Sequence, residues 1–138
     1  MLVQTLYTSQ AQMPMADAGN GHILLEALAY NPHHGLTGFL FRSRNHFLQF
    51  LEGTEHDVKE VMARITLDPR HEQILAWPLV PTSARLFGDW TMGFAGGVAE
   101  PEVLLIRSLP RTVETLATLR PKLREMAAPY FSDPVNAH

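Results

Sequence analysis

The sequence predicts an α+β fold: a ferredoxin-like βαββαββ sheet with two helices on one face and C-terminal helices on the other. Three observations predict it. Apolar runs of strand length alternate with two segments of helical periodicity in the order β-α-β-β-α-β-β. Right-handed crossovers fold that order into one sheet with both connecting helices on the same side. Beyond Gly96 and Gly97, two further amphipathic segments remain to cover the opposite face.

The first half of the chain supplies a strand, a helix and a hairpin. Residues 2–7 alternate in part between apolar and polar side chains, which predicts the first strand. Apolar residues recur at helical spacing in 23–28, and Asn31-Pro32 ends that helix because the residue before a proline avoids the helical conformation. Two aromatic-rich runs, 35–41 and 46–52, are separated by a polar segment and predict a hairpin.

The second helix is predicted between a capping signal and a proline. Thr54 and Asp57 have the spacing of a capping box, and the apolar residues after them lie on one face until Asp68-Pro69. Residues 74–80 and 86–94 are the next strand candidates. The first of these contains a proline and another follows it directly, so we expect edge strands or bulges there.

Two amphipathic stretches, 102–109 and 112–127, are predicted to be helices that pack on the sheet. Pro121 should kink or split the second one, because proline has no backbone N–H and its ring clashes with the preceding turn. We therefore divide the chain into a core domain at residues 1–97 and a helical extension at residues 98–138.

Length and composition indicate one small globular unit. The 138 residues are 46% apolar, enough for one packed core. No apolar run is long enough to cross a bilayer and the N-terminus lacks a secretion signal, so we expect a cytoplasmic protein that does not bind membranes. The absence of cysteine excludes disulfides and thiol nucleophiles. A net charge of −3 offers no basic surface for the backbone of a nucleic acid.

Familiar enzyme and metal motifs are missing from the sequence. Seven histidines are scattered, and the segment beginning at His71 lacks the second histidine of a zinc-protease motif, so we predict no metal site. Gly19-Asn20-Gly21 begins like a dinucleotide fingerprint but does not continue as one. Neither a nucleophile elbow nor a phosphate-binding loop is present, and we expect no intrinsic enzymatic turnover.

Three polar residues in apolar surroundings are more informative. Tyr7 and Gln49 lie inside predicted strands, on the side expected to face the helices, where an unpartnered amide costs about 1–3 kcal/mol. Asn31 ends the first helix. Each residue alone has an ordinary structural explanation, since asparagine often ends helices and buried polar side chains are often satisfied locally. Together they suit a planar heterocycle with apolar faces and polar edges, such as the isoalloxazine of a flavin.

Five short motifs lie in order along the predicted elements of residues 2–94. They are Tyr7-Thr8-Ser9, Asn31-Pro32-His33-His34-Gly35-Leu36-Thr37-Gly38, Phe47-Leu48-Gln49-Phe50-Leu51-Glu52-Gly53, Asp68-Pro69-Arg70-His71 and Arg85-Leu86-Phe87-Gly88-Asp89-Trp90-Thr91-Met92-Gly93-Phe94. These motifs resemble those of the BLUF family of blue-light sensors using flavin. Two details depart from the family pattern: Leu36 replaces the usual β-branched residue, and Ala29 and Tyr30 differ from the polar residues often seen before the asparagine.

The resemblance implies a blue-light photoreceptor that holds FAD, with FMN and riboflavin as alternatives. Tyr7 would exchange an electron and a proton with the excited flavin and Gln49 would end rotated or tautomerised, without net redox change and with absorption shifted to the red. Asn31 would clamp the polar edge of the ring, and Ile23 would pack on its face. Other flavin contacts implied are Ser9, Phe47, Asp68, Arg70 and His71.

The resemblance also implies a signalling path. Trp90 or Met92 would report the state of Gln49, although Trp90 also suits plain core packing, and the Asp68 to His71 segment also suits an ordinary turn. The partners expected are a separate effector protein and further copies of this chain, because the C-terminal helices carry more leucines than the chain can bury. Two other readings stay open: a light-independent ferredoxin-like interaction module and a small flavin-dependent enzyme.

Overall fold

The structure, a computed structural model, describes residues 1–12, 35–69, 71–88 and 93–130. It contains one mixed sheet in the order β4-β1-β3-β2-β6, with β5 also paired to β1. The strands are β1 (Leu2–Ala11), β2 (Thr37–Arg42), β3 (His46–Thr54), β4 (His71–Ala76), β5 (Val80–Thr82) and β6 (Gly93–Ala95).

The sheet has the predicted ferredoxin-like arrangement. Strand β1 lies between β3 and β4, antiparallel to both, and β2 and β3 form the predicted hairpin. Strand β6 pairs in parallel with the outer side of β2. The first predicted helix, with Ile23 and Asn31, lies outside the described residues.

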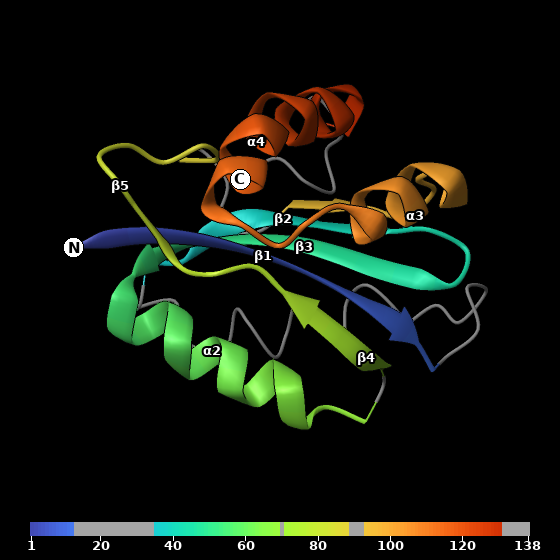
Figure 1. Ribbon diagram of the computed structural model, residues 1–138, viewed down its shortest axis with the longest axis horizontal. Coiled ribbons are helices and arrows are strands. Elements are labelled where there is room, and N and C mark those ends of the chain that lie inside the picture. Colours follow the sequence, from blue (N-terminus) through green and yellow to red (C-terminus); the bar gives the residue numbers. More distant parts are fainter. Residues whose placement is uncertain (13–34, 70, 89–92, 131–138) are drawn as a thin grey trace.

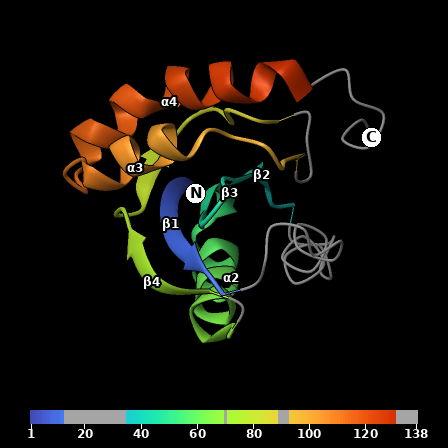
Figure 2. The ribbon, with the colours of Figure 1, turned by 90° about the vertical axis from the view of Figure 1, so that its right-hand side faces the viewer.

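Helices lie on opposite sides of the sheet (Figures 1 and 2). Helix α2 (Glu55–Leu67) covers one face, while α3 (Glu100–Ser108) and α4 (Val113–Ala127) cover the other, and a short 3-10 turn (Ala128–Tyr130) follows α4. The prediction that the C-terminal helices pack on the second face is confirmed, and the division of the chain at residue 97 stays a prediction. No helix within the described residues is long and apolar enough to cross a membrane.

Strand alternation sorts most of the apolar side chains into two large clusters, and Leu40 and Phe47 form a third, small one. On the α2 side, Tyr7 and Leu51 pack with the buried face of the helix, whereas Leu6 and Phe50 point to the α3 and α4 side. Full burial of each large apolar side chain contributes about 1.5–3 kcal/mol relative to exposure. The α2-side cluster is Val3, Tyr7, Leu36, Leu51, Val58, Val61 and Ile65.

The ends of α2 follow the predicted signals. The side chain of Thr54 accepts a hydrogen bond of 3.3 Å from the backbone N–H of Asp57, which confirms the N-cap. At the other end Asp68 leaves the helical conformation and its N–H still reaches the carbonyl of Ile65 at 3.1 Å. Helix α2 therefore ends four residues before His71, the first residue of β4.

Two strand predictions were wrong in part. In place of one strand at 74–80, the structure has β4, which begins at His71, then a segment at 77–79 that is not strand, and then β5 at the same edge. Of the predicted strand at 86–94, residues 86–88 are not extended strand. The backbone N–H groups of Leu86 and Phe87 bond to the side-chain carboxylate of Glu52 at 2.6 Å, and so they are not available for a strand ladder.

Of the kink or split predicted at Pro121, the split is wrong, because α4 runs without interruption from Val113 to Ala127, and the kink stays a prediction. Leu119 and Leu123 on either side of the proline are buried against the sheet, and this packing compensates for the lost backbone hydrogen bond.

Candidate functional site

The centre of the site is a hydrogen bond between Tyr7 and Gln49. The two residues are directly paired across β1 and β3, and both side chains point to the α2 side of the sheet. The hydroxyl of Tyr7 donates to Oε1 of Gln49 over 2.6 Å, and both residues are completely buried. The side of the sheet predicted for both residues from strand parity is confirmed, and their hydrogen bond satisfies two polar groups that would otherwise be costly to bury.

Burial raises the pKa of Tyr7 well above its ordinary value, and the negative charge of Asp68 raises it further. The side chain is consequently a neutral phenol at physiological pH and keeps its proton in the hydrogen bond to Gln49. If an electron is removed from such a phenol, its proton becomes strongly acidic. The oxygen of Gln49 is the acceptor already in place for that proton.

A second polar pair joins β1 to the end of α2. Ser9 Oγ lies 2.6 Å from Nδ1 of His71, and Nε2 of the same ring lies 2.7 Å from the carbonyl oxygen of Ile65. A carbonyl oxygen can only accept, so Nε2 carries a proton; with a neutral ring, Nδ1 accepts from the Ser9 hydroxyl. The His71 ring also meets Tyr7 edge-on, with centroids 5.9 Å apart.

Phe47 and Asp68 lie on the margins of this pair. The Phe47 ring is buried and packs edge-on to the His71 ring, with the two centroids 6.1 Å apart. The guanidinium of Arg42 lies over the Phe47 ring, 4.8 Å from its centroid. Asp68 is half-buried at the end of α2. An open cavity of about 470 Å³ adjoins it, lined by Arg64, Leu67, Asp68 and Pro69.

The structure describes six of the predicted site residues. Gln49 and His71 contact Tyr7, Ser9 and Phe47 contact the His71 ring, and Asp68 lies at the margin of the site. The others cannot be placed, because they lie outside the described residues, and their predicted roles are untested. These others are Ile23, Asn31, Arg70, Trp90 and Met92.

Glu52 is a polar residue of this region that the sequence analysis quoted within a motif without assigning it a role. It lies three residues after Gln49 on β3 and is completely buried, with its carboxylate on the opposite face of the sheet from Gln49. An acidic residue inside a run of apolar strand residues was the signal available, because buried carboxylates are rare unless they have several donors.

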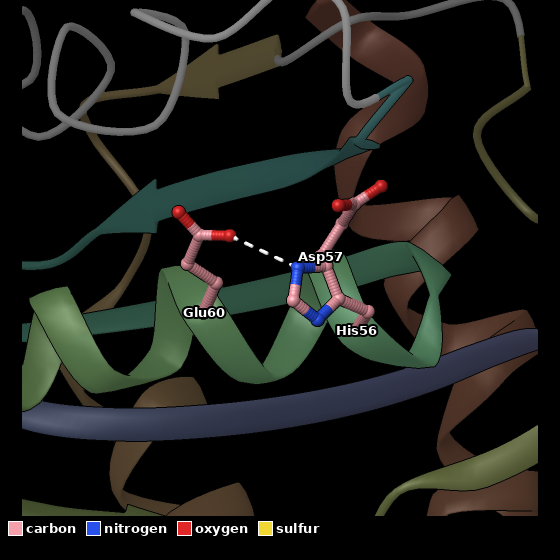
Figure 3. Close-up of side chains that lie close together, drawn as sticks. All are labelled: His56, Asp57 and Glu60. Atoms are coloured by element: carbon pink, nitrogen blue, oxygen red, sulfur yellow. Dashed lines mark ion pairs between the residues drawn. The ribbon is translucent and has the colours of Figure 1, made fainter.

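Histidine and carboxylate side chains also meet on the outer surface of α2 (Figure 3). Among the described residues, His56, Asp57 and Glu60 form a group with the ligand types of a metal site, and Figure 3 shows His56 and Glu60 turned toward each other. The distance from His56 Nε2 to Glu60 Oε2 is 3.5 Å, and Glu60 also binds Arg64 at 3.2 Å. The His56 ring is 85% exposed, so we assign the group to ion pairing along a solvated helix face.

The described residues fit a flavin by the chemistry of their side chains. Gln49 presents an amide, with both donor and acceptor atoms, inside an apolar cluster next to a buried phenol. A flavin ring needs apolar faces, together with donors and acceptors at its edge. Tyr7 and Gln49 would hold its polar edge, with Ser9 and His71 supporting the wall of the site.

Comparison with known proteins gives consistent matches to light sensors. Residues 2–93 match the BLUF family, described as sensors of blue-light using FAD. Photoactivated adenylate cyclase subunit beta of Euglena gracilis is 41% identical over 58 residues, which are 42% of this chain and 7% of the cyclase subunit. The chain thus spans only a small part of that relative.

Solved structures support the same assignment. The dark-state structure of BlrB, a BLUF protein, is 30% identical with a TM-score of 0.61, and the match covers 96% of this chain and 86% of BlrB. BlsA in its photo-activated state shares the fold with a TM-score of 0.71 at 22% identity, over 90% of this chain and 95% of BlsA. The family match over most of the chain and the likeness to BlrB lead to one conclusion: this chain belongs to the BLUF family of blue-light sensors using flavin.

Proposed function

We propose that this chain senses blue light through the Tyr7 and Gln49 pair and passes the signal to a separate protein without turning over a substrate. The observation that carries this proposal is the buried 2.6 Å hydrogen bond from Tyr7 to Gln49. A phenol whose proton is already shared with an amide is prepared for coupled loss of an electron and a proton. An amide beside it has two ends that can exchange hydrogen-bond partners.

Bound flavin supplies the chromophore, which blue light converts into a strong oxidant. Tyr7 would give one electron to the bound flavin, and its hydroxyl proton would follow by way of Oε1 of Gln49. Electron and proton would both return to Tyr7 in the reverse step, so that no net oxidation remains. Gln49 would be left rotated or tautomerised, with its hydrogen bonds redistributed around the ring edge, and this is the stored signal.

The neighbouring residues hold the site in place. Ser9 and His71 connect β1 to the end of α2 and support the wall beside Tyr7. We assign ring-edge or ribityl contacts to Asn31, Asp68 and Arg70, and apolar contacts to Ile23 and Phe47. Trp90 and Met92 are assigned to the relay that reports the state of Gln49.

Cofactor, partner and location follow from the same reading. The flavin proposed is FAD, with FMN and riboflavin as alternatives that the same ring contacts would accept. The partner is a separate effector protein in the cytoplasm. Self-association is supported by apolar side chains that α3 and α4 leave in solvent, namely Leu104, Leu105 and Val113, which are 46%, 63% and 47% exposed.

The experiment is a light-minus-dark absorption spectrum of the purified, flavin-loaded chain. We expect a reversible shift to the red, because a stronger hydrogen bond to the ring carbonyl lowers the excitation energy. Tyr7→Phe and Gln49→Leu should retain flavin and lose the shift. Gln10→Leu, at the far end of β1, and Tyr130→Phe, after α4, are the matched controls and should keep it.

Two results would contradict the proposal. A chain that refuses added flavin in the dark would exclude light sensing through this site. A normal red shift in Tyr7→Phe or Gln49→Leu would show that the photochemistry does not run through this pair. Sustained turnover with an added reductant would favour a flavin enzyme instead, and partner binding that is equal in light and darkness would favour a light-independent interaction module.

A further inference from the structure

The Glu52 side chain is 0% exposed, and its carboxylate accepts hydrogen bonds from four donors. Its Oε1 accepts from Gln4 Nε2 at 3.1 Å and from the backbone N–H of Leu86 at 2.6 Å. Its Oε2 accepts from Thr37 Oγ1 at 2.9 Å and from the backbone N–H of Phe87 at 2.6 Å. Two oxygens with two donors each use the full acceptor capacity of a carboxylate, so each partner is held in a defined position.

The carboxylate fastens the segment that leads to β6. Leu86 and Phe87 bond to Glu52 through their backbone, and the Phe87 ring inserts between aromatic side chains of β2 and β3. Its centroid lies 5.5 Å from that of Phe39 and 5.7 Å from that of Phe50. A movement of β3 at Glu52 must therefore either carry this segment along or break charge-assisted hydrogen bonds.

The same group of contacts reaches α4. Gln4 donates to Glu52 with Nε2 and accepts with Oε1 from Arg120 of α4 at 2.9 Å. An anion on the nitrogen side of the amide and a cation on the oxygen side fix its orientation. A second arginine of the helix, Arg124, donates to the carbonyl of Leu86 at 3.3 Å. Helix α4 is thereby connected to the 84–87 segment both directly and through Gln4.

Glu52 and Gln49 occupy one strand but opposite faces. Gln49 meets Tyr7 on the α2 side, whereas Glu52 meets Gln4 and α4 on the other side. Three residues of extended strand span about 10 Å. Strand β3 is paired on both sides, with β1 and β2, so its backbone connects the two faces as one stiff unit.

We propose that Glu52 is the positioning residue through which the state of Gln49 is transmitted across the sheet to α4. It acts through Gln4 and Arg120 on the helix and through Leu86 and Phe87 on the segment before β6. This inference rests on the proposed function, because it gives a route for the signal that Gln49 stores. It assigns Glu52 no part in flavin binding or in electron transfer.

The first experiment compares Glu52→Gln with the parent chain, both carrying flavin. Glutamine keeps the size but directs an NH2 group at donors that need an acceptor, so two of the four hydrogen bonds are lost. Absorption reports the photochemistry, and amide hydrogen exchange of 84–88 and of α4, in light and in darkness, reports transmission. We expect Glu52→Gln to retain the red shift and to lose the light-minus-dark exchange difference in α4. Glu72→Gln, an exposed carboxylate on β4, is the control that should retain both.

The second experiment keeps the test decisive if Glu52→Gln does not fold. Arg120→Met removes the donor to Gln4 from a helix surface position, and Arg120→Lys restores a donor there. We expect Arg120→Met to retain the red shift and lose the exchange difference in α4, and Arg120→Lys to regain part of it. Arg111→Met removes the same charge at an exposed position before α4 and should behave like the parent.

The outcomes separate this inference from the proposed function. A parent chain without a red shift would refute both. A parent with a red shift but no light-dependent exchange in α4 would overturn the inference alone. A full exchange difference in either Glu52→Gln or Arg120→Met would do the same, because the signal would then reach α4 by another path.

Discussion

Ser9 Oγ lies 2.6 Å from Nδ1 of His71, whose Nε2 is bound to the carbonyl of Ile65, so that with a neutral ring the serine hydroxyl is the donor. This contact ties β1, which carries Tyr7, to the junction of α2 and β4. Its removal should therefore affect the whole wall beside the flavin.

Ser9→Ala leaves a buried ring nitrogen of His71 without its donor. We expect the free energy of unfolding to fall by about 1–3 kcal/mol, the usual cost of an unsatisfied buried polar group. Urea denaturation of the flavin-loaded chain measures it. Ser83→Ala removes an exposed hydroxyl and should change stability by less than about 0.5 kcal/mol. Equal effects of the two substitutions would argue against a structural role for the Ser9 bond.

Gly38→Ala should be among the most damaging small substitutions in the chain. A Cβ at Gly38 would overlap the carbonyl oxygen of Phe50, a backbone atom of the neighbouring strand that cannot turn away. We expect a loss of about 3 kcal/mol or more, measured by thermal and urea unfolding. Gly97→Ala is the matched control, since its added methyl group would meet nothing within 4 Å. A stable Gly38→Ala variant would mean that β2 can move away from β3.

Stability should depend on pH through Glu100 at the start of α3. Partial burial alone would raise the pKa of Glu100, but hydrogen bonds from His46, Ser43 and the backbone of Asn45 outweigh it, and the pKa lies below its ordinary value. A depressed pKa contributes stability above the unfolded value of about 4.3, and this stability is lost as pH falls through the folded value. The stability difference between the parent and Glu100→Gln should thus shrink below about pH 4.

The control for that measurement is Glu114→Gln, an exposed carboxylate in the first turn of α4. It should leave the pH dependence of unfolding close to that of the parent. If Glu100→Gln also leaves the pH dependence of unfolding unchanged, the hydrogen bonds from Ser43, Asn45 and His46 to Glu100 do not contribute to it.

Tyr7 should make the free energy of unfolding depend on pH in the alkaline range. Its pKa is raised by burial and by the charge of Asp68, so the folded chain keeps the phenol proton where an unfolded tyrosine loses it. The stabilising contribution is complete below about pH 10 and is lost as pH rises further. Tyr7→Phe should flatten the decline in unfolding free energy above about pH 10, and Tyr130→Phe should leave it steep. An unaltered decline in Tyr7→Phe would assign it to other groups.

Pro121→Ala should stabilise the chain. Alanine restores a backbone N–H in the middle of α4 and has a far higher helix propensity than proline, so we expect a gain of up to about 3 kcal/mol. The side chain at this position is exposed, which leaves the packed face of α4 unchanged. Thermal unfolding measures the gain. A loss would mean that the proline ring itself makes a stabilising contact.

Strand parity was sufficient to predict the central pair of the site. Tyr7 has the parity of Val3 on β1, and Gln49 has the parity of Leu51 on β3, and the structure places all four side chains on the α2 side. The α2 cap at Thr54 followed from local chemistry in the same way. Such features depend on short-range periodicity and on a single hydrogen bond, both of which a sequence displays directly.

The features that the sequence did not reveal depend on distant partners. Residues 86–88 have a strand-like composition, but a carboxylate from β3 captures their backbone donors. Pro121 is a helix breaker by local rules, but packing of its neighbours on the sheet outweighs the local cost. Glu52 itself could not be assigned a role, because its donors come from β1, β2 and the 84–87 segment, and their convergence is visible only in three dimensions.

The odd spacing between Gln49 and Glu52 has a consequence for anyone who would re-engineer this sensor. Insertion of a single residue between them would turn the carboxylate toward the chromophore and leave the loop amides without their acceptor, since neighbouring side chains on a strand point to opposite faces. Insertion of two residues would return the carboxylate to the side opposite Gln49 but would lengthen the strand. The parity of this short interval, more than its composition, keeps the light-sensitive side and the output side of the sheet distinct.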